Sequence, residues 1–433
     1  MPAHRPAEPA EALPADLEPD RVGELVAWAA SGVMALTGRA DAAPLGPPAG
    51  FVTELRAIAH RLATDARALG GRVRLDPLAL LAERAAVRGL TRQGSTSCGG
   101  TTRLLPVADG WIAASLSRPE DVELIPAWLR IDPPGDDAWE AVAGAVAARP
   151  GAEVVEWGRR LGLPLSVLAE PSTDPRLRRP EARPLPVREV RLRGHAPART
   201  SLADVVVVDL TGLWAGPLCG RILAEAGAQV VKVESTGRPD GARRGPARFY
   251  DLLNGGKRSV ALDFDRPAGR RALVGLLERA DVVLEASRPR ALEQLGIDAA
   301  ALVAGGGPQV WVSITGHGRT GPARDWVAFG DDAAVAGGLV CWDGPQPCFC
   351  ADAVADPLTG LVAASATLGV LRVGARWMLD VAMSRVARRL AGPTLPVGTP
   401  APEVAPPRAH RPRARAAALG RDTEAVLREL GVR

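Results

Sequence analysis

The chain of 433 residues lacks several patterns that would each assign it to a definite class of protein. No apolar run reaches the roughly 20 residues that a membrane-spanning helix needs. The N-terminal stretch, 1–20, is rich in proline, alanine and acidic side chains and contains no apolar core of a signal peptide. We therefore expect a cytoplasmic protein with no membrane partner.

Cysteine is scarce, and its spacing fits no metal site. The five cysteines form no CxxC pair and no Cys/His ligand pattern. Isolated thiols of this kind are most often buried. We therefore expect no metal, and buried thiols at Cys98, Cys219, Cys341, Cys348 and Cys350.

Aromatic residues make up only 4% of the chain and do not alternate with basic ones. The net charge is +4, and the basic residues concentrate in two Pro- and Arg-rich stretches, 172–200 and 391–415. A nucleic-acid surface usually combines a basic patch with a recognisable binding motif. We expect no nucleic-acid partner, and we interpret both stretches as solvated connectors.

The length predicts two or three domains. The first half contains helical patterns at 22–36 and 51–69, a loop rich in Gly, Ser and Thr at 92–102, and a β-hairpin at 103–116 that turns at Asp109-Gly110. We divide the chain into a disordered N-terminus (1–20), a small α+β domain (21–171), a linker (172–200), a Rossmann-like α/β domain (201–390) and a connector with a C-terminal helix (391–433).

Residues 203–314 alternate β-branched runs with helical patterns, which predicts a parallel sheet covered on both faces. Ligands bind such sheets beyond the carboxyl ends of the strands. No GxGxxG follows the first run, so we do not expect a nicotinamide or flavin enzyme. The predicted strands are 204–210, 229–233, 259–264, 281–285 and 309–314.

The stretch 348–370, CFCADAVADPLTGLVAASATLGV, is the centre of the chain's organisation. From Leu358 it carries no charge until Arg372, which is typical of a buried helix. Asp356 stands directly before Pro357, a residue favoured in the first helical turn. Asp356 could therefore be a plain N-cap, or a carboxylate nucleophile or base fixed on a rigid element.

Four motifs in this half resemble the family III CoA-transferases, whose superfamily includes formyl-CoA transferase, carnitine-CoA transferases and α-methylacyl-CoA racemase. They are VVDLTGLWAGPLCGRILAEAGAQVVKVE (207–234), LNGGKRSVALDF (253–264), ADVVLEASRPRALEQLGID (280–298) and SITGHGRTGP (313–322). The resemblance extends from Val205 to about Arg385. It implies an acyl-CoA:carboxylate CoA-transferase with no bound cofactor and with a CoA thioester and a carboxylic acid as substrates.

The segment ADPLTGL resembles the family's catalytic motif, and its aspartate is Asp356. By that resemblance Asp356 forms acyl-anhydride and CoA-thioester intermediates, whereas Asp352 is interpreted as a loop acid. Arg243 is a further basic candidate. The implied CoA-binding residues are Ala215, Gly216, Pro217, Arg238, Lys257, Arg258, Arg288, Gly316, His317 and Gly318.

The chain also departs from the family's pattern. Ala286-Ser287 and Gln294 replace residues that usually contact the nucleotide part of CoA. Racemases of the superfamily have a histidine upstream of the aspartate, and the corresponding stretch here, 328–338, contains only the acids Asp331 and Asp332. An acyl-CoA racemase and a non-catalytic acyl-CoA-binding subunit therefore remain alternatives.

The order of the parts is unusual for the family, because a piece like its small domain comes first. Residues 28–44 resemble the segment before the catalytic helix, and the loop 92–102 resembles the family's glycine loop. We expect the loop, with Gly94, Gly99 and Gly100, to form a lid over Asp356. The family's shape also implies a homodimer.

Overall fold

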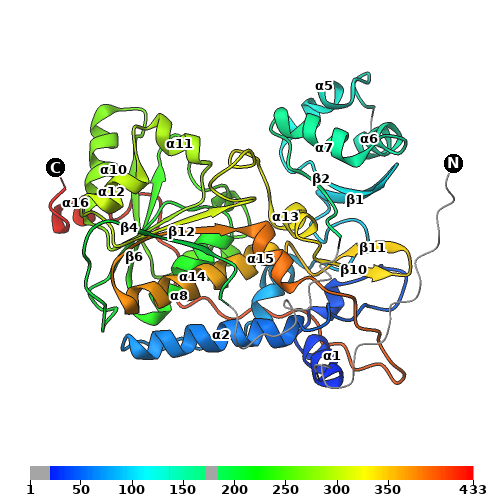
Figure 1. Cartoon of the computed structure of the whole chain (residues 1–433), viewed down its shortest axis with the longest axis horizontal. Coiled ribbons are helices and arrows are strands. Elements are labelled where there is room, and N and C mark those ends of the chain that lie inside the picture. The colour runs from blue at the N-terminus through cyan, green and yellow to red at the C-terminus, as the bar shows by residue number, and fades with distance from the viewer. Residues whose placement is uncertain (1–19, 136, 171–183, 433) are drawn as a thin grey trace.

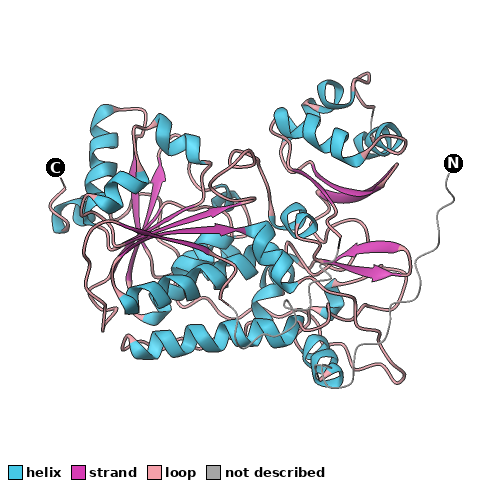
Figure 2. Ribbon diagram, in the orientation of Figure 1, coloured by secondary structure: helices cyan, strands magenta, loops and turns pink. Residues whose placement is uncertain are grey.

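A seven-stranded sheet forms the centre of the computed structural model, which describes residues 20–135, 137–170 and 184–432 (Figures 1 and 2). The strand order is β4-β12-β9-β8-β5-β6-β7, and only β4 runs antiparallel to its neighbour. The predicted α/β fold with a parallel sheet is confirmed. The strands are β4 (Arg188–Leu192), β5 (Val206–Asp209), β6 (Gln229–Ser235), β7 (Arg258–Leu262), β8 (Val282–Glu285), β9 (Val310–Thr315) and β12 (Arg376–Ala382).

The strands are apolar on both faces because helices cover both sides of the sheet. Side chains alternate along a strand, so Val207 joins one hydrophobic core and Val208 the other. The first core includes α8 (Ala215–Ala226), α9 (Ala247–Asn254), α14 (Ala355–Val373) and α15 (Met383–Leu390). The second includes α10 (Pro267–Arg279), α11 (Pro289–Gln294), α12 (Ala299–Ala304) and α16 (Thr423–Glu429).

The helix predicted after Asp356 is α14, and 15 of its 19 residues are buried. Gly360 lets α14 approach α8 closely, because a Cβ at this position would lie 2.6 Å from the Ala215 carbonyl oxygen. α2 (Phe51–Ala68) packs along another side of α14 (Figure 1). The first turn of α14 is therefore held by protein on several sides.

The N-terminal segment packs onto the main domain, contrary to our prediction of a separate small domain over residues 21–171. α1 (Arg21–Ala30), η2 (Met34–Leu36), α2, η3 (Ala79–Leu81) and α3 (Glu83–Arg88) contribute to the same core as α8 and α14. The apolar face of α2 is covered by α14, which is distant from it in sequence. This packing places the N-terminal segment beside the predicted catalytic helix.

A smaller lobe with its own core begins only after residue 100 (Figure 1). Its sheet pairs β1 (Thr102–Val107), β2 (Gly110–Ser115) and β3 (Leu165–Val167), and the predicted hairpin turn at Asp109-Gly110 is confirmed. α6 (Ala138–Val146) and α7 (Gly151–Arg160) pack on this sheet, α5 (Ile125–Leu129) packs on both of these helices, and α4 (Pro119–Glu123) contacts α5. α13 (Gly330–Ala336) packs on β2 and β3 of the lobe and on α14 and α15, and the hairpin of β10 (Val340–Asp343) and β11 (Gln346–Phe349) contacts β1.

The two predicted connectors are not simple solvated linkers. Residues 188–192 of the first form the edge strand β4, while 171–183 lie outside the described residues, as do 1–19 of the predicted disordered N-terminus. The second runs over the protein surface and bonds to it. The Leu395 amide donates to the Pro47 carbonyl, and the Ala416 amide donates to the Asp251 carboxylate at 2.8 Å.

All five cysteines are buried and free, as predicted. Within the described part of the chain, no helix combines the length and apolar character needed to cross a lipid bilayer.

Candidate active site

Asp356 is the second residue of α14 and lies inside the helix rather than at the N-cap position that the sequence predicted. The chain enters the helix through a tight turn in which Ala351 and Ala353 adopt positive φ of 59° and 42°. The Asp356 amide donates to the Ala353 carbonyl at 2.9 Å. The carboxylate is therefore carried by the first helical turn, where free amides and the helix dipole favour negative charge.

The start of α8 faces the start of α14. The backbone amide of Ala215, at the first position of α8, favours the charged form of the Asp356 carboxyl group and so lowers its pKa. The turn before α8 is held by Asp240, whose carboxylate accepts the Leu213 amide at 2.9 Å. Because α8 follows β5, this meeting point lies beyond the carboxyl end of a central strand, where the fold class predicts a site.

α13 closes a third side of the Asp356 carboxyl group. A Cβ on Gly330 would lie 2.4 Å from Asp356 Oδ2, so the backbone of α13 touches the carboxylate directly. Asp331 accepts the Ala353 amide at 3.0 Å, and the Ser97 side chain favours the charged form of this acid. The acid noted in the sequence as a possible partner of Asp356 thus lies in the same cluster.

The N-terminal segment supplies the fourth side. Arg84 on α3 forms a bidentate ion pair with Asp352, with Nε–Oδ2 and Nη2–Oδ1 distances of 2.8 and 2.5 Å. Cys98 contacts the Ala351 carbonyl at 3.5 Å. Asp352, expected to be a loop acid, is in fact fully buried and paired.

The predicted lid loop lies close to this cluster. The Phe349 amide donates to the Gly94 carbonyl at 2.9 Å, and a Cβ on Gly99 would lie 3.6 Å from Arg84 Nη2. Gly94 and Gly100 both adopt positive φ, of 66° and 80°, which glycine accepts at no steric cost. The loop therefore borders the site from within the same chain.

Burial raises the pKa of Asp356 to about 7, and the negative charges of Asp331 and Asp352 act in the same direction. Arg84 and the Ala215 amide oppose the increase. Burial likewise raises the pKa of Asp331 to about 6. The cluster can therefore present a carboxylate nucleophile, or exchange a proton, close to neutral pH.

Lys257 does not lie where a CoA phosphate could reach it. Its side chain is buried, and its ammonium donates to Asp209 Oδ2 and the Pro217 carbonyl at 2.8 Å and to Asn254 Oδ1 at 3.1 Å. The three donors of the ammonium are thus all used by the protein. The geometry disfavours the predicted phosphate contact and makes Lys257 a support for the first turn of α8.

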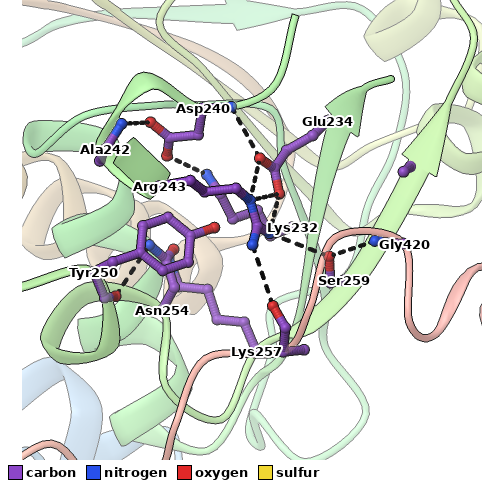
Figure 3. Close-up of polar contacts among 12 residues, drawn as sticks. Lys232, Glu234, Asp240, Ala242, Arg243, Tyr250, Asn254, Lys257, Ser259 and Gly420 are labelled. Carbon is purple, nitrogen blue, oxygen red and sulfur yellow. Dashed lines mark hydrogen bonds and ion pairs between the residues drawn. The ribbon is translucent and has the colours of Figure 1, made fainter. Parts of the chain in front are cut away.

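Two other basic candidates are also engaged. Arg258 begins β7, and its guanidinium pairs with Glu429 on α16, with an Nη2–Oε1 distance of 3.0 Å. Arg243, in η5 (Gly241–Arg244), holds the Glu234 carboxylate with an Nη2–Oε2 distance of 2.5 Å within the polar cluster of Figure 3. Both cations stabilise the scaffold rather than stand open to a ligand.

Arg238 and Arg288 follow the carboxyl ends of β6 and β8, and neither guanidinium has an ion pair or hydrogen bond with the described residues. Burial lowers the pKa of Arg288, and the nearby charges of Arg290, Arg118 and Arg238 lower it further. These charges act on Arg288 where the larger domain meets the smaller lobe, but Asp325 opposes them and Arg118 is paired with Asp121. Such a group of cations fits a phosphate-bearing ligand.

The turn after β9 holds the last predicted residues. Gly318 adopts a φ of 110°, and a Cβ on Gly316 would lie 2.5 Å from that of Ala328, so both glycines are sterically required. Burial lowers the pKa of His317 to about 4, and its ring packs edge-on against Trp326. His317 is therefore neutral at physiological pH, and within the described part of the chain no hydrogen bond connects it to Asp356.

Sequence reasoning missed Arg84 and Gly330. No local pattern marks Arg84, because its partner Asp352 lies 268 residues further along the chain. Gly330 precedes the two acids that we had noted, yet its contact with Asp356 depends on how α13 packs. Ala286 and Ser287, the departures from the family pattern, lie after β8, where Ser287 donates to the buried Glu285 at 3.0 Å.

Comparisons with known proteins agree with the sequence motifs. A family model described as CoA-transferase family III matches residues 202–419. An acyl-CoA transferase of Fusarium pseudograminearum is 30% identical over 203 residues, which are 43% of this chain and 44% of that protein. A succinyl-CoA–D-citramalate CoA-transferase of Chloroflexus aurantiacus is 35% identical over 145 residues, 32% of this chain and 36% of the relative.

Solved structures give partial matches of the same kind. The Mycobacterium tuberculosis protein Rv3272 is 30% identical, with a TM-score of 0.40, over 44% of this chain and 55% of that one. A CAIB/BAIF family protein from Brucella suis is 30% identical, with a TM-score of 0.39, over 45% and 55%. The chain spans about half the length, or less, of the curated relatives it matches. Because the family model covers half of the chain, with all four motifs and Asp356 inside the match, the protein belongs to CoA-transferase family III.

Proposed function

We propose that this protein moves CoA from an acyl-CoA thioester to a carboxylic acid, with Asp356 as the nucleophile. The observation that supports this most directly is the meeting of the starts of α8 and α14, where the Ala215 amide favours the charged form of the Asp356 carboxyl group. The same amide can stabilise the negative oxygen that develops during acyl transfer. Two relatives are described as an acyl-CoA transferase and a succinyl-CoA–D-citramalate CoA-transferase, which supports the same class of reaction.

The proposed reaction passes through two kinds of covalent intermediate, anhydrides and a thioester. The Asp356 carboxylate attacks the thioester carbonyl, forming an acyl–aspartyl anhydride and releasing CoA thiolate. The thiolate then attacks the aspartyl carbonyl, giving an aspartyl–CoA thioester and the free donor acid. The acceptor carboxylate attacks this thioester, forming an acceptor–aspartyl anhydride and releasing CoA thiolate, which then attacks the acceptor's carbonyl in that anhydride. The new acyl-CoA leaves, and Asp356 is restored as a carboxylate.

The CoA nucleotide would bind beyond the carboxyl ends of the strands. We assign its phosphates to Arg238 and Arg288, which have no other partner among the described residues. The backbone of 215–217 and 316–318 would carry the rest of the ligand, since the glycines there permit close approach. The loop with Gly94, Gly99 and Gly100 would shield the reactive intermediates from water.

Mass spectrometry of the intact protein tests this proposal. After incubation with succinyl-CoA, we expect a species heavier by one CoA minus one water, which disappears on treatment with hydroxylamine. Asp356→Asn, which keeps the shape of the side chain but removes its charge, should give no such species. An Asp356→Asn protein that still transfers CoA would contradict the mechanism, whereas binding without any adduct would favour a non-catalytic acyl-CoA-binding subunit.

A second candidate, an acyl-CoA racemase, is favoured by one observation. Asp331 and Asp356 are two acids in one cluster, each with a raised pKa, and racemisation needs two proton-exchanging groups. Incubation with 2-methylacyl-CoA in deuterated water separates the two reactions. Deuterium at the α-carbon without CoA transfer would replace our first proposal with this one.

We also propose that the protein acts as a homodimer in the cytoplasm, as the family resemblance implies. Light scattering after size-exclusion chromatography measures the mass directly. A monomer with full transfer activity would contradict the dimer but not the role of Asp356.

A further inference from the structure

Arg84 lies outside the part of the chain that matches the family model, residues 202–419. It sits on α3, a short helix held in place by its neighbour Glu83, which pairs with Arg221 of α8 at 3.3 Å and also contacts His410. The two side chains therefore anchor α3 to different elements. Glu83 fixes the helix against α8, and Arg84 reaches the turn that leads into α14.

The guanidinium of Arg84 contacts the starts of both helices that meet at Asp356. Its two hydrogen bonds to Asp352 hold the turn that leads into α14. The guanidinium carbon of Arg84, Cζ, also lies 5.1 Å from the ring centroid of Trp214, the residue directly before Ala215. A planar cation with a forked set of donors suits this double contact, because one face stacks on the ring while one edge binds the carboxylate.

We infer that Arg84 is a positioning residue of this site, which clamps the starts of α8 and α14 together and holds a fixed positive charge opposite the Asp356 carboxylate. The inference rests on the proposed function only in naming Asp356 as the reacting group. A fixed cation in a site with little water stabilises the ionised nucleophile and the negative intermediate that follows. The N-terminal segment thus completes the active site from within the same chain.

The Asp356 carboxyl group is surrounded by one cation, two acids and a backbone amide. Arg84 supplies the positive charge that acts on its carboxyl, whereas Asp331 and Asp352 are acids and Ala215 contributes an amide. The acids of α2 are engaged elsewhere, since Asp65 pairs with Arg372 and Glu54 with Arg389. Removal of the Arg84 charge should therefore leave Asp356 facing mainly negative groups.

The titration of Asp356 tests this role without any need for turnover. A water-soluble carbodiimide with glycine ethyl ester labels protonated carboxyl groups, and peptide mass spectrometry reports the labelling of Asp356 at each pH. In the wild type we expect half-maximal labelling near pH 7. In Arg84→Gln the midpoint should rise by on the order of one pH unit, because a nearby opposite charge lowers a carboxyl pKa by about 1–3 units.

Two further variants separate charge from simple structural support. Arg84→Lys keeps the charge and should return the midpoint most of the way to the wild-type value. Arg88→Gln changes an exposed arginine on the same helix and should leave the midpoint unchanged. An Arg84→Gln midpoint equal to the wild type, or an Arg84→Lys midpoint equal to that of Arg84→Gln, would overturn the inference.

Arg84→Gln leaves Asp352 buried without its cation and could for that reason fail to fold. A double variant covers this case. Arg84→Gln with Asp352→Asn replaces the ion pair by two amides that can still bond to each other. Arg84 acts on Asp356 more strongly than Asp352 does, so the midpoint should still rise, though by less. A midpoint that stays or falls would contradict the inference. If Asp356 forms no adduct with succinyl-CoA, the proposed function fails, and the titration still reports on Arg84.

Discussion

The backbone of Gly330 lies directly against the carboxylate of Asp356. A Cβ added to Gly330 would lie only 2.4 Å from Asp356 Oδ2. The same Cβ would lie 2.4 Å from the Ala353 carbonyl oxygen, in the turn that leads into α14. A real Cβ could not stand at these distances unless the Asp356 carboxylate or the Ala353 backbone moved. Gly330 therefore keeps open the space that the Asp356 carboxylate occupies.

Gly330→Ala should displace Asp356 and lower the rate of CoA transfer by at least about 100-fold, since small misplacements of a reacting group have effects of that size. Steady-state transfer assays measure the loss, and urea unfolding measures the stability of the variant. Gly144→Ala is the matched control, because a Cβ there meets nothing within 4 Å and alanine suits the interior of a helix. An active Gly330→Ala enzyme would show that Asp356 does not react from this position.

Lys257→Met should lower the free energy of unfolding by about 3–5 kcal/mol, because it leaves the buried Asp209 carboxylate without its ion-pair partner. Any folded fraction should show a lower kcat, because Lys257 holds the first turn of α8 through the Pro217 carbonyl. Arg258→Gln is the comparison, and the loss of its exposed pair with Glu429 should have little effect on the free energy of unfolding. A stable Lys257→Met protein with only a raised KM for CoA esters would restore the phosphate contact predicted from the sequence.

The stability of the protein should fall as pH rises from about 5 to about 8. Burial raises the pKa of Asp332 from 3.8 to about 8, and the charge of Asp331 adds to this. The folded state therefore holds this proton more tightly than the unfolded chain does, so that proton loss at high pH destabilises the folded state. Asp331 and Asp356, whose pKa values are about 6 and 7, act in the same direction.

Asp332→Asn should flatten this pH dependence. The amide oxygen can still accept the Phe329 N–H, which Asp332 Oδ1 accepts at 2.7 Å, but the side chain no longer titrates. Urea unfolding near pH 5 and near pH 8 measures the difference, which we expect to shrink by an amount on the order of 1 kcal/mol or more. Equal pH dependence in the two proteins would show that Asp332 titrates in its ordinary range.

A fragment of residues 200–433 should not fold into a stable monomer. The fragment lacks α2, which packs along α14, and the Arg84 partner of the buried Asp352. Near-UV circular dichroism and light scattering would report a loss of fixed packing and a tendency to associate. Coexpression with residues 1–199 should restore the near-UV bands and suppress the association. A monomeric fragment with sharp near-UV bands would contradict the shared core.

The main sheet and α14 could be predicted because their patterns are local. The run VVVV at 205–208 is apolar at every position, and the stretch that begins at Leu358 carries no charge until Arg372. The position of Asp356 before a proline added a third local signal. These features depend on the chain within one element, which is the range that sequence patterns report well.

The remaining features depend on contacts between distant parts of the chain. Lys257 follows two glycines and precedes a strand, which is typical of a surface cation, yet the buried Asp209 lies within reach of its ammonium. The predicted helix 22–36 breaks because Gly32 adopts a φ of 83°, and Pro406 and Pro407 pack against that glycine. Neither result has a signature in the neighbouring residues.

The packing of α2 against α14 also constrains how the protein is made. The apolar face of α2 is complete once residue 68 has been synthesised, but its partner helix begins only at residue 355. Translation proceeds at about 5–20 residues per second, so the roughly 290 residues between them take on the order of 15–60 seconds. During that interval the face of α2 that packs on α14 has no native partner on the ribosome. We therefore expect chaperones that hold exposed apolar helices to bind the early nascent chain.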